Sequence, residues 1–304
     1  GIINATINRK DTNNLFDEVK NLKKKYKYTK IQKLSSSELS TIIDTDFYDG
    51  GCLDFGAGHL NPLKFVQGLG TAAKKNNVQI FEKCCVEKID YGKKNTISVS
   101  NGYTVVSDYL IIACNGYLGN LEPNISSRVM PINNFILTTE VLGNNLLNSF
   151  LNNNYAVADN KFVPNYFRPS PDNRLIFGGG ENYTYRFPKD IKTIVRKKML
   201  KVYPQLKNTR IDFAWGGTLA VTRNRLPYFA KIQPNVFSAS GYSGHGVALS
   251  VLAGKIIAEL IEGDSKRFNF MNNIPIKPFP GNSNFQWPLL VLGMLWYSLR
   301  DRFK

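Results

Sequence analysis

The sequence of 304 residues predicts an α/β fold, in which a partly parallel sheet carries a ligand site and a second domain is built from antiparallel strands. Three observations predict it. An apolar segment at 235–240 is followed by a glycine-rich turn and by a long helix with one apolar face. A second apolar run, 109–113, ends in another turn. Finally, apolar and polar residues alternate in several segments of the region 130–225.

The segment NVFSASGYSGHGVALSVLAGKIIAELIE, residues 235–262, is the most informative stretch. Its apolar start predicts a buried strand, and Gly241, Gly244 and Gly246 allow a tight turn that no side chain obstructs. Apolar residues then recur every three or four positions, and Gly263 is the expected end of the helix. Such a helix start presents unpaired N–H groups to a carbonyl or a phosphate. An ordinary strand-to-helix connection explains the local pattern equally well.

The first 119 residues contain predicted helices followed by short strands. The expected helices cover 15–25, 36–43 and 62–76. The second has a capped start at Ser35 with Glu38, and Asn61 is the N-cap of the third, before Pro62. The expected strands cover 78–82, 85–91, 96–99 and 103–106.

The run 109–113 is apolar throughout, which predicts a strand covered on both faces. It ends at Cys114, Asn115 and Gly116, where the backbone turns at the carboxyl edge of a parallel sheet. Ligands bind at such edges.

The region 130–225 predicts a second domain folded over the ligand. Its expected strands cover 135–141, 165–168, 175–178 and 211–216, with one helix over 190–203 that ends at Pro204. Polar and aromatic residues in or just after these strands are candidates for the ligand site, although a surface or core role explains each one singly: Tyr166, Arg168, Trp215 and Arg223.

Composition narrows the class of protein. With 43% apolar residues the chain can bury a sizeable core. The net charge of +16 comes from lysines that are scattered along the chain. The sequence contains neither a set of zinc ligands nor an RNA-binding motif, so we expect no nucleic-acid partner. The four cysteines form no C-x-x-C pair and only two histidines are present, which predicts a reduced, cytoplasmic chain without a metal site. The sequence GYSGH lacks the last glycine of a serine-hydrolase elbow.

Nine segments resemble the D-amino-acid-oxidase-like superfamily of FAD-dependent amine oxidoreductases, in order along nearly the whole chain. They are YDGG (48–51), GAGHLNPLKF (56–65), IIACNGYLGNLEP (111–123), RVMPINNF (128–135), VADNKFVPNYFR (157–168), LIFGGGE (175–181), AWGGTLAVTRNRLP (214–227), GYSGHGVALS (241–250) and WPLLVLGMLWYSLRDR (287–302). The resemblance implies a glutathione-reductase-like, Rossmann-type FAD domain in two segments, 1–129 and 226–304, with an antiparallel substrate domain at 130–225 between them.

The resemblance also implies positions for the cofactor. The turn at Ala113, Cys114, Asn115 and Gly116 would lie beside FAD, and the backbone of Val86 would face the adenine. The flavin ring would meet the second turn, formed by Gly241, Tyr242, Ser243, Gly244, His245, Gly246 and Val247. Its N–H groups would stabilise negative charge on the reduced flavin, each charge-assisted bond contributing about 1.5–3 kcal/mol.

The chemistry implied is hydride transfer from the amine-bearing carbon to FAD, with oxygen or another electron acceptor reoxidising the flavin. Tyr166, Arg168, Trp215 and Arg223 would orient the substrate from the second domain. His245 would assist the flavin rather than abstract a proton, and a packing or capping histidine is the alternative.

Two departures from relatives refine the expected substrate. Sarcosine oxidases attach the flavin through a cysteine in the segment that matches GTLAVT, where this chain has Leu219, so the FAD is expected to be non-covalent. They also carry a lysine where this chain has Ala248. An amine without a carboxylate next to the reacting carbon is therefore favoured, such as a gamma-glutamyl polyamine. An amino-acid or sarcosine-type oxidase is the alternative.

A third departure concerns the strand and G-x-G-x-x-G turn that hold the FAD pyrophosphate in this family. The chain has no such element, since the glycines at 68 and 70 fall in a predicted helix without a preceding strand. We therefore expect the amino-terminal part of the enzyme to be missing from the chain, as in a partial or split gene. Its absence would weaken FAD binding by on the order of 5 kcal/mol, roughly a thousandfold or more. A non-catalytic remnant that acts as a binding module is the alternative.

The tail 287–304 is apolar over its first 13 residues and ends in basic residues. It is too short to cross a bilayer. A docked terminal helix or a contact with a partner is the favoured interpretation, and a peripheral membrane contact is the alternative.

Overall fold

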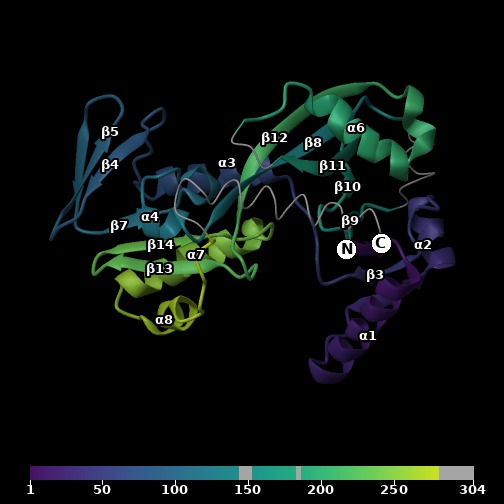
Figure 1. Cartoon of the computed structure of the whole chain (residues 1–304), viewed down its shortest axis with the longest axis horizontal. Helices are drawn as coiled ribbons and strands as arrows, with labels where there is room; N and C mark the ends of the chain where they lie inside the picture. Colours follow the sequence, from purple (N-terminus) through teal and green to yellow (C-terminus); the bar gives the residue numbers. More distant parts are fainter. Residues whose placement is uncertain (144–152, 183–185, 281–304) are drawn as a thin grey trace. The chain divides into compact units, whose positions relative to one another are not determined.

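The computed structural model describes residues 1–143, 153–182 and 186–280 (Figure 1). Its residues form two compact units: unit 1 contains 1–60 and 133–217, and unit 2 contains 61–132 and 218–280. The boundary between the units falls inside two long strands, β8 (Met130–Thr139) and β12 (Ile211–Val221).

Unit 1 is built on an eight-stranded sheet with the order β12-β8-β11-β10-β9-β1-β3-β2. Its remaining strands are β1 (Ile2–Thr6), β2 (Ile31–Ser35), β3 (Gly50–Asp54), β9 (Ala156–Asp159), β10 (Tyr166–Pro169) and β11 (Leu175–Asn182). β1 runs parallel to β9, whereas β10 and β11 pair in antiparallel fashion. The sheet therefore joins the first strands of the chain to the strands of the middle region.

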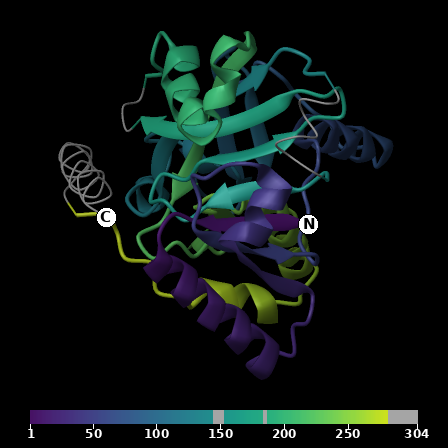
Figure 2. The same ribbon diagram turned by 90° about the vertical axis from the view of Figure 1, so that its right-hand side faces the viewer.

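Helices cover both faces of this sheet. The main core contains α2 (Ser36–Ile43), α6 (Ile191–Val202) and the 3-10 turn η2 (Pro204–Asn208). On the other face, α1 (Arg9–Lys25) packs through Val19 in a separate core with Ile31 and Cys52. Figure 2 shows α6, in green, lying over the strands of the sheet, against which its fully buried Val195 and Met199 pack. Phe177 of β11 and Phe167 of β10 stack in the same core, with ring centroids 5.4 Å apart. Alternation along each strand leaves the other face of the sheet free of this core.

Unit 2 contains two small sheets. The first has the order β13-β14-β7, from β13 (Tyr228–Gln233), β14 (Val236–Ser240) and β7 (Leu110–Ile112). The second is the meander β4 (Val86–Asp90), β5 (Asn95–Val99) and β6 (Thr104–Ser107). The helical elements are α3 (Pro62–Lys75), η1 (Asn115–Tyr117), α4 (Pro123–Ser126), α7 (Gly246–Ile261) and α8 (Lys266–Asn272).

Helices α7 and α8 pack on one face of the first sheet of unit 2 (Figure 1). Ile256 and Ile257 of α7 and Phe268 of α8 bury Phe237 of β14. Ile112 and Val236 point to a separate core on the other face. β14 is therefore buried on both sides, as its apolar sequence predicts.

Most expected elements are confirmed. Ser35 and Glu38 form a capping box at the start of α2, and Asn61 caps α3 before Pro62. Asp190 caps α6, and Gly263 follows α7 with a positive φ of 105°. Helix α1 begins at Arg9, six residues before the expected start, because Asn8 accepts a hydrogen bond from the backbone of Asp11.

Two expectations about strands are wrong. Residues 78–82 form no strand, and Val78, Ile80 and Phe81 are exposed, because no described strand lies beside them to complete the hydrogen bonds. β7 is a strand, but it is not covered on both faces, since Ile111 and the preceding Tyr109 are about half exposed. Among the described strands it has a neighbour on one side only.

The units also divide the chain differently from the expected segments 1–129, 130–225 and 226–304. Residues 1–60 group with 133–217, because β1 pairs with β9 from Ile2 and Ala156 onwards. The sequence pattern predicts no strand in the first 60 residues, although three of the eight strands of the unit 1 sheet lie there.

The core of unit 1 gives a stability prediction. Replacing the fully buried Phe177 by alanine (Phe177→Ala) removes its stack with Phe167 and leaves a cavity, so the free energy of unfolding should fall by about 3–5 kcal/mol. Urea denaturation followed by circular dichroism measures it. Phe55→Ala, at a half-exposed position of the same unit, is the control and should cost less than about 1 kcal/mol. Equal losses in the two variants would contradict this assignment of the core.

Candidate cofactor and substrate site

The carboxyl ends of two parallel strands meet at one edge of the first sheet in unit 2. β14 and β7 pair in parallel from Val236 and Leu110 to Ser238 and Ile112, and the Ser238 hydroxyl donates to the Ile112 carbonyl at 2.7 Å. Each strand is followed by one of the turns that the sequence analysis singled out. The structure therefore brings the segments 113–116 and 241–247 together at one sheet edge.

A side-chain hydrogen bond fastens the two turns to each other. The Gly241 N–H donates to Oδ1 of Asn115 at 3.0 Å. Asn115 has a positive φ of 48°, a conformation that asparagine tolerates better than most residues. Because both partners lie in turns, this bond fixes the distance between the ends of β7 and β14.

The second turn is held in a left-handed path. Gly241 and Gly244 have φ values of 71° and 95°, and a side chain on Gly241 would place its Cβ 2.5 Å from the Thr222 methyl group. Ser243 is buried: its N–H donates to the Ala220 carbonyl at 2.9 Å and its hydroxyl to the Gly241 carbonyl at 3.1 Å. The end of β12 thus holds the turn in place through the hydrogen bond between Ala220 and Ser243.

The start of α7 is open to solvent. His245 is the N-cap residue, yet its side chain makes no capping hydrogen bond. Gly244, His245 and Val247 are exposed. Tyr242 points away into the structure, where its hydroxyl donates to the Ala239 carbonyl at 3.0 Å and burial raises the pKa of its phenol to about 12. The N-terminus of α7 is therefore an uncapped row of N–H groups suited to an electron-rich ligand.

The first turn is closely packed on its inner side. A Cβ on Gly116 would lie 2.9 Å from the Leu219 carbonyl oxygen, so only glycine allows this approach. The Thr218 N–H donates to the Tyr117 hydroxyl at 2.9 Å. Cys114 is half-buried, and burial raises the pKa of its thiol, whereas Ala113 is exposed at the sheet edge. Ala113 thus remains accessible to a ligand, while Cys114 is held as a neutral thiol.

Val86 lies at a separate hollow of about 430 Å³ in unit 2. Its walls are Val86 to Ile89 of β4 together with Leu118, Asn120 and Leu121, which follow η1. The backbone at the start of β4 is thus beside the chain that leaves the first turn.

Three of the four candidate substrate residues share the open face of the unit 1 sheet. Tyr166 and Arg168 are two residues apart on β10, and the intervening Phe167 points to the core. Trp215 on β12 is about half exposed. Its two neighbours face the core: Ala214 packs against it, and a Cβ added to Gly216 would lie 2.9 Å from the core residue Phe135. The three side chains therefore project from the same side of the sheet.

Tyr166 and Arg168 are each held by neighbours. The Tyr166 hydroxyl donates to Oδ1 of Asn134 on β8, and burial raises the pKa of its phenol. Its ring covers Gly178, the residue opposite it on β11, where an added Cβ would lie 2.1 Å from ring atoms. Arg168 donates to the Leu60 carbonyl at 3.2 Å, and burial lowers the pKa of its guanidinium. No local pattern distinguishes Asn134 or Gly178, although they lie in the motifs RVMPINNF and LIFGGGE, respectively.

Arg223 is not part of this face. It lies in unit 2 after β12, is exposed, and donates to the Pro278 carbonyl at 3.1 Å. Its guanidinium thus positions the segment that follows α8.

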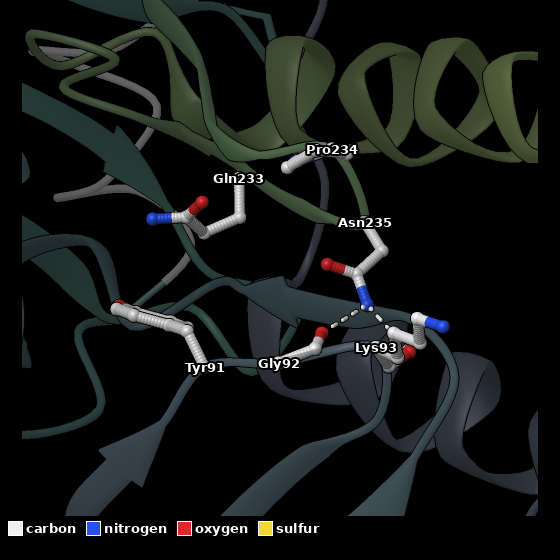
Figure 3. A pocket seen from close by; sticks show the side chains of 6 residues that line it. All are labelled: Tyr91, Gly92, Lys93, Gln233, Pro234 and Asn235. Atoms are coloured by element: carbon white, nitrogen blue, oxygen red, sulfur yellow. Dashed lines mark hydrogen bonds between the residues drawn. The ribbon is translucent and has the colours of Figure 1, made fainter.

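A further hollow of unit 2, of about 500 Å³, lies at the opposite end of β14 (Figure 3). Tyr91, Gly92 and Lys93 face Gln233, Pro234 and Asn235 across it. Asn235 precedes β14 and donates to the carbonyls of Gly92, Lys93 and Asp108. Because this hollow is at the amino end of the strand, it is separate from the turns at the carboxyl edge.

Neither a metal cluster nor a membrane-spanning helix is found in the part of the chain that the structure describes. There, His, Cys, Asp and Glu nowhere gather in threes as metal ligands would. None of the helices there combines the length and the apolar character needed to cross a bilayer. The tail 287–304 lies outside the described residues.

Comparisons with known proteins agree with this architecture. Residues 1–260 match the family described as FAD dependent oxidoreductase (DAO). The chain is 37% identical over 287 residues to gamma-glutamylputrescine oxidoreductase of Escherichia coli K12, a match that covers 94% of this chain and 67% of the relative. It is 38% identical over 279 residues to a protein called probable oxidoreductase OrdL of Rhizobium meliloti, covering 92% of the chain and 65% of the relative. The chain thus spans about two thirds of the length of these relatives.

Solved structures share the fold. Glycine oxidase from Geobacillus kaustophilus superposes with a TM-score of 0.77 at 18% identity, covering 91% of this chain and 75% of that one. Fructosyl peptide oxidase from E. terrenum superposes with a TM-score of 0.75 at 14% identity, covering 91% of this chain and 73% of that one. The chain therefore has the mixed α/β fold of these oxidases, as the sequence predicted.

The bond between Asn115 and Gly241 gives a testable prediction. Asn115→Ala removes the acceptor and the residue that favours a positive φ, so the free energy of unfolding should fall by about 1–3 kcal/mol. Asn115→Asp keeps an acceptor oxygen and should cost less than half as much. Chemical denaturation of both variants measures this. If Asn115→Asp and Asn115→Ala lower the free energy of unfolding equally, the hydrogen bond from Gly241 to the Asn115 side chain does not hold the two turns together.

The contact between Tyr166 and Gly178 gives a second prediction. Gly178→Ala forces the Tyr166 ring out of its place, an overpacking that should cost about 1–3 kcal/mol of stability. The same substitution in a Tyr166→Ala background should be nearly neutral, because the ring is gone. A double-mutant cycle by urea denaturation tests this. Additive effects would show that the ring does not lie over Gly178.

Proposed function

Because the chain belongs to the DAO family of FAD-dependent oxidoreductases, we propose that it forms part of a flavoenzyme that oxidises an amine similar to gamma-glutamylputrescine. One observation carries this proposal. The uncapped start of α7 follows the left-handed turn from Gly241 to Gly244, at the carboxyl ends of the parallel strands β14 and β7. Its N–H groups suit the electron-rich edge of a flavin.

The residues present fit a non-covalent FAD. Gly244 has open space around its Cβ position, so a flat ring can approach the backbone of the turn. Leu219, in the segment after Trp215, offers no atom for a covalent link. The exposed His245 would contact the flavin through its side chain, and Val247 would add an N–H group from the first turn of α7. Ala113 to Gly116 and Val86 would extend the site toward the rest of the dinucleotide.

FAD, when bound, supplies a two-electron acceptor for hydride from the amine-bearing carbon, after which oxygen or another acceptor takes the electrons. The residues of unit 1 would bind and orient the substrate. Tyr166 offers a neutral hydroxyl held by Asn134, and Arg168 offers a cation for a carboxylate distant from the reacting carbon. Trp215 offers an exposed apolar surface for the methylene chain.

Two finer proposals follow from the length of the relatives and from the cysteines. We infer that a complementary part completes the pyrophosphate site, since the chain spans about two thirds of its relatives and its sequence contains no G-x-G-x-x-G. We also infer a cytoplasmic location, because all four cysteines are free.

Titration with FAD tests the proposed function. The flavin absorption spectrum should shift on binding, and the bound flavin should bleach anaerobically with gamma-glutamylputrescine but not with sarcosine. Gly246→Leu should weaken FAD binding at least tenfold, because the new side chain covers the N–H groups while its Cβ makes only ordinary contact with Tyr242.

Gly70→Leu is the matched control, since Gly70 lies within α3 with open space around it, and FAD binding should change less than twofold. Binding without bleaching by the amine would favour the non-catalytic alternative. If FAD causes no spectral shift at any concentration, with or without the complementary part of the relative, the proposal is wrong.

A further inference from the structure

The end of α1 carries a dense group of positive charges. Residues 20–33 contain seven lysines and no acidic residue. Five of these form what we call the lysine cluster: Lys23, Lys24 and Lys25 in the last turn of α1, Lys27 in the turn that follows, and Lys30 just before β2. All five are exposed. In Figure 1 and Figure 2 this end of α1, in purple, projects beyond the strands on which the helix packs.

The positive charges of the lysine cluster are not neutralised by carboxylates. None of its side chains forms an ion pair or a hydrogen bond with a residue that the structure describes. Two carboxylates near the cluster have other partners: Asp17 pairs with Lys20 at 2.8 Å, and Asp54 on β3 accepts a hydrogen bond from the Tyr28 hydroxyl. Glu18 is the remaining acidic residue in this half of α1. The cluster thus keeps a large excess of positive charge.

Helix stability explains only part of this charge. Cations at the carboxyl end of a helix interact favourably with its dipole, which accounts for the three lysines in the last turn of α1. It does not account for the two lysines that follow the helix. The charges also repel one another. Partial burial lowers the pKa of Lys33 on β2, and the positive charges of Lys20 and Lys23 lower it further.

Lys27 occupies a backbone position that favours glycine. The N–H groups of Tyr26 and Tyr28 donate to the Leu22 carbonyl at 3.1 and 3.2 Å and thereby end α1. Lys27, between them, has a φ of 55°, in the left-handed region. Glycine is the commonest residue at such helix ends, because a side chain is strained there. Local folding therefore does not explain a lysine at this position, whereas a role for its charge does.

An exposed aromatic ring lies among these charges. Tyr26 is 65% exposed, and its ring centroid lies 5.3 Å from Nζ of Lys25. We propose that the lysine cluster binds the anionic surface of a membrane, with the Tyr26 ring at the level of the lipid headgroups. Tyrosine suits this boundary because its ring is apolar and its hydroxyl is polar. The inference concerns unit 1 alone and does not depend on the proposed binding of FAD.

The arrangement of the lysines favours a lipid surface over a strand of nucleic acid. Consecutive residues of an α-helix are about 100° apart around its axis. Lys23, Lys24 and Lys25 therefore point in different directions around the helix end and do not form a row. Proteins that bind single strands follow the backbone along a positively charged groove and stack successive bases on several aromatic rings. The lysine cluster has one well exposed ring, Tyr26, because Tyr28 is partly buried.

Vesicle sedimentation tests the inference. The full chain should bind vesicles of phosphatidylcholine and phosphatidylglycerol in equal amounts at least tenfold more tightly than vesicles of phosphatidylcholine alone. The triple variant Lys24→Gln, Lys25→Gln and Lys27→Gln should weaken binding to the mixed vesicles roughly a hundredfold, since each lysine near an anionic surface contributes about fivefold. Glutamine is chosen because its helix propensity is close to that of lysine.

The matched control removes the same net charge from another helix of unit 1. Lys192, Lys197 and Lys201 are exposed on α6. Their replacement by glutamine should change binding to the mixed vesicles less than threefold. Circular dichroism first verifies that both triple variants fold like the parent chain. Equal losses in the two triple variants would show that net charge, and not the lysine cluster, determines binding, and would overturn the proposal.

A single variant separates binding from folding. Lys27→Gly relieves the positive φ, so the urea midpoint of unfolding should rise, while binding to the mixed vesicles should weaken about fivefold. If this variant binds as tightly as the parent chain, the charge of Lys27 has no role at the membrane.

Two further outcomes would overturn the proposal. One is the absence of binding to the mixed vesicles. The other is tighter binding of single-stranded poly(U) RNA than of these vesicles at the same ionic strength, lost in the triple variant of the lysine cluster, which would identify nucleic acid as the occupant.

Discussion

The hydrogen bond from the Gly241 N–H to Asn115 is the constraint on which the candidate cofactor site depends. It joins residues 126 positions apart and holds the ends of two parallel strands at a fixed separation. The left-handed turn, the buried Ser243 and the uncapped helix start all follow from where Gly241 is held. The direction of the backbone N–H groups in this turn is set by the fold and not by side-chain rotamers.

Local sequence signals predicted the helices well, because their determinants lie within a few residues. The capping box at Ser35 and the Asn61–Pro62 start fixed the beginnings of α2 and α3. The glycine turn and α7 were predicted for the same reason. The pattern also indicated β7 and β14, and the parallel pairing of their ends is what brings the two turns together.

What the sequence did not predict depends on distant partners. The strands within residues 1–60 exist because β1 pairs with β9, more than 150 residues away. Residues 78–82 have the composition of a strand but no described neighbour to pair with. The hydrogen bond from Tyr166 to Asn134 and the glycine beneath its ring depend on the register of three strands, which no local pattern specifies.

The chain alternates between its two units, crossing near residues 60, 132 and 217. Neither unit is therefore a contiguous stretch that a single cleavage could release. A chain that stopped after residue 217 would still contain all the described residues of unit 1, but unit 2 would lose β13, β14 and α7. A nonsense mutation there would remove the parallel partner of β7 and the turn from Gly241 to Val247 together, while the unit 1 sheet kept its strands up to Gly217. Among the described residues, a truncation after residue 217 thus falls on unit 2 alone.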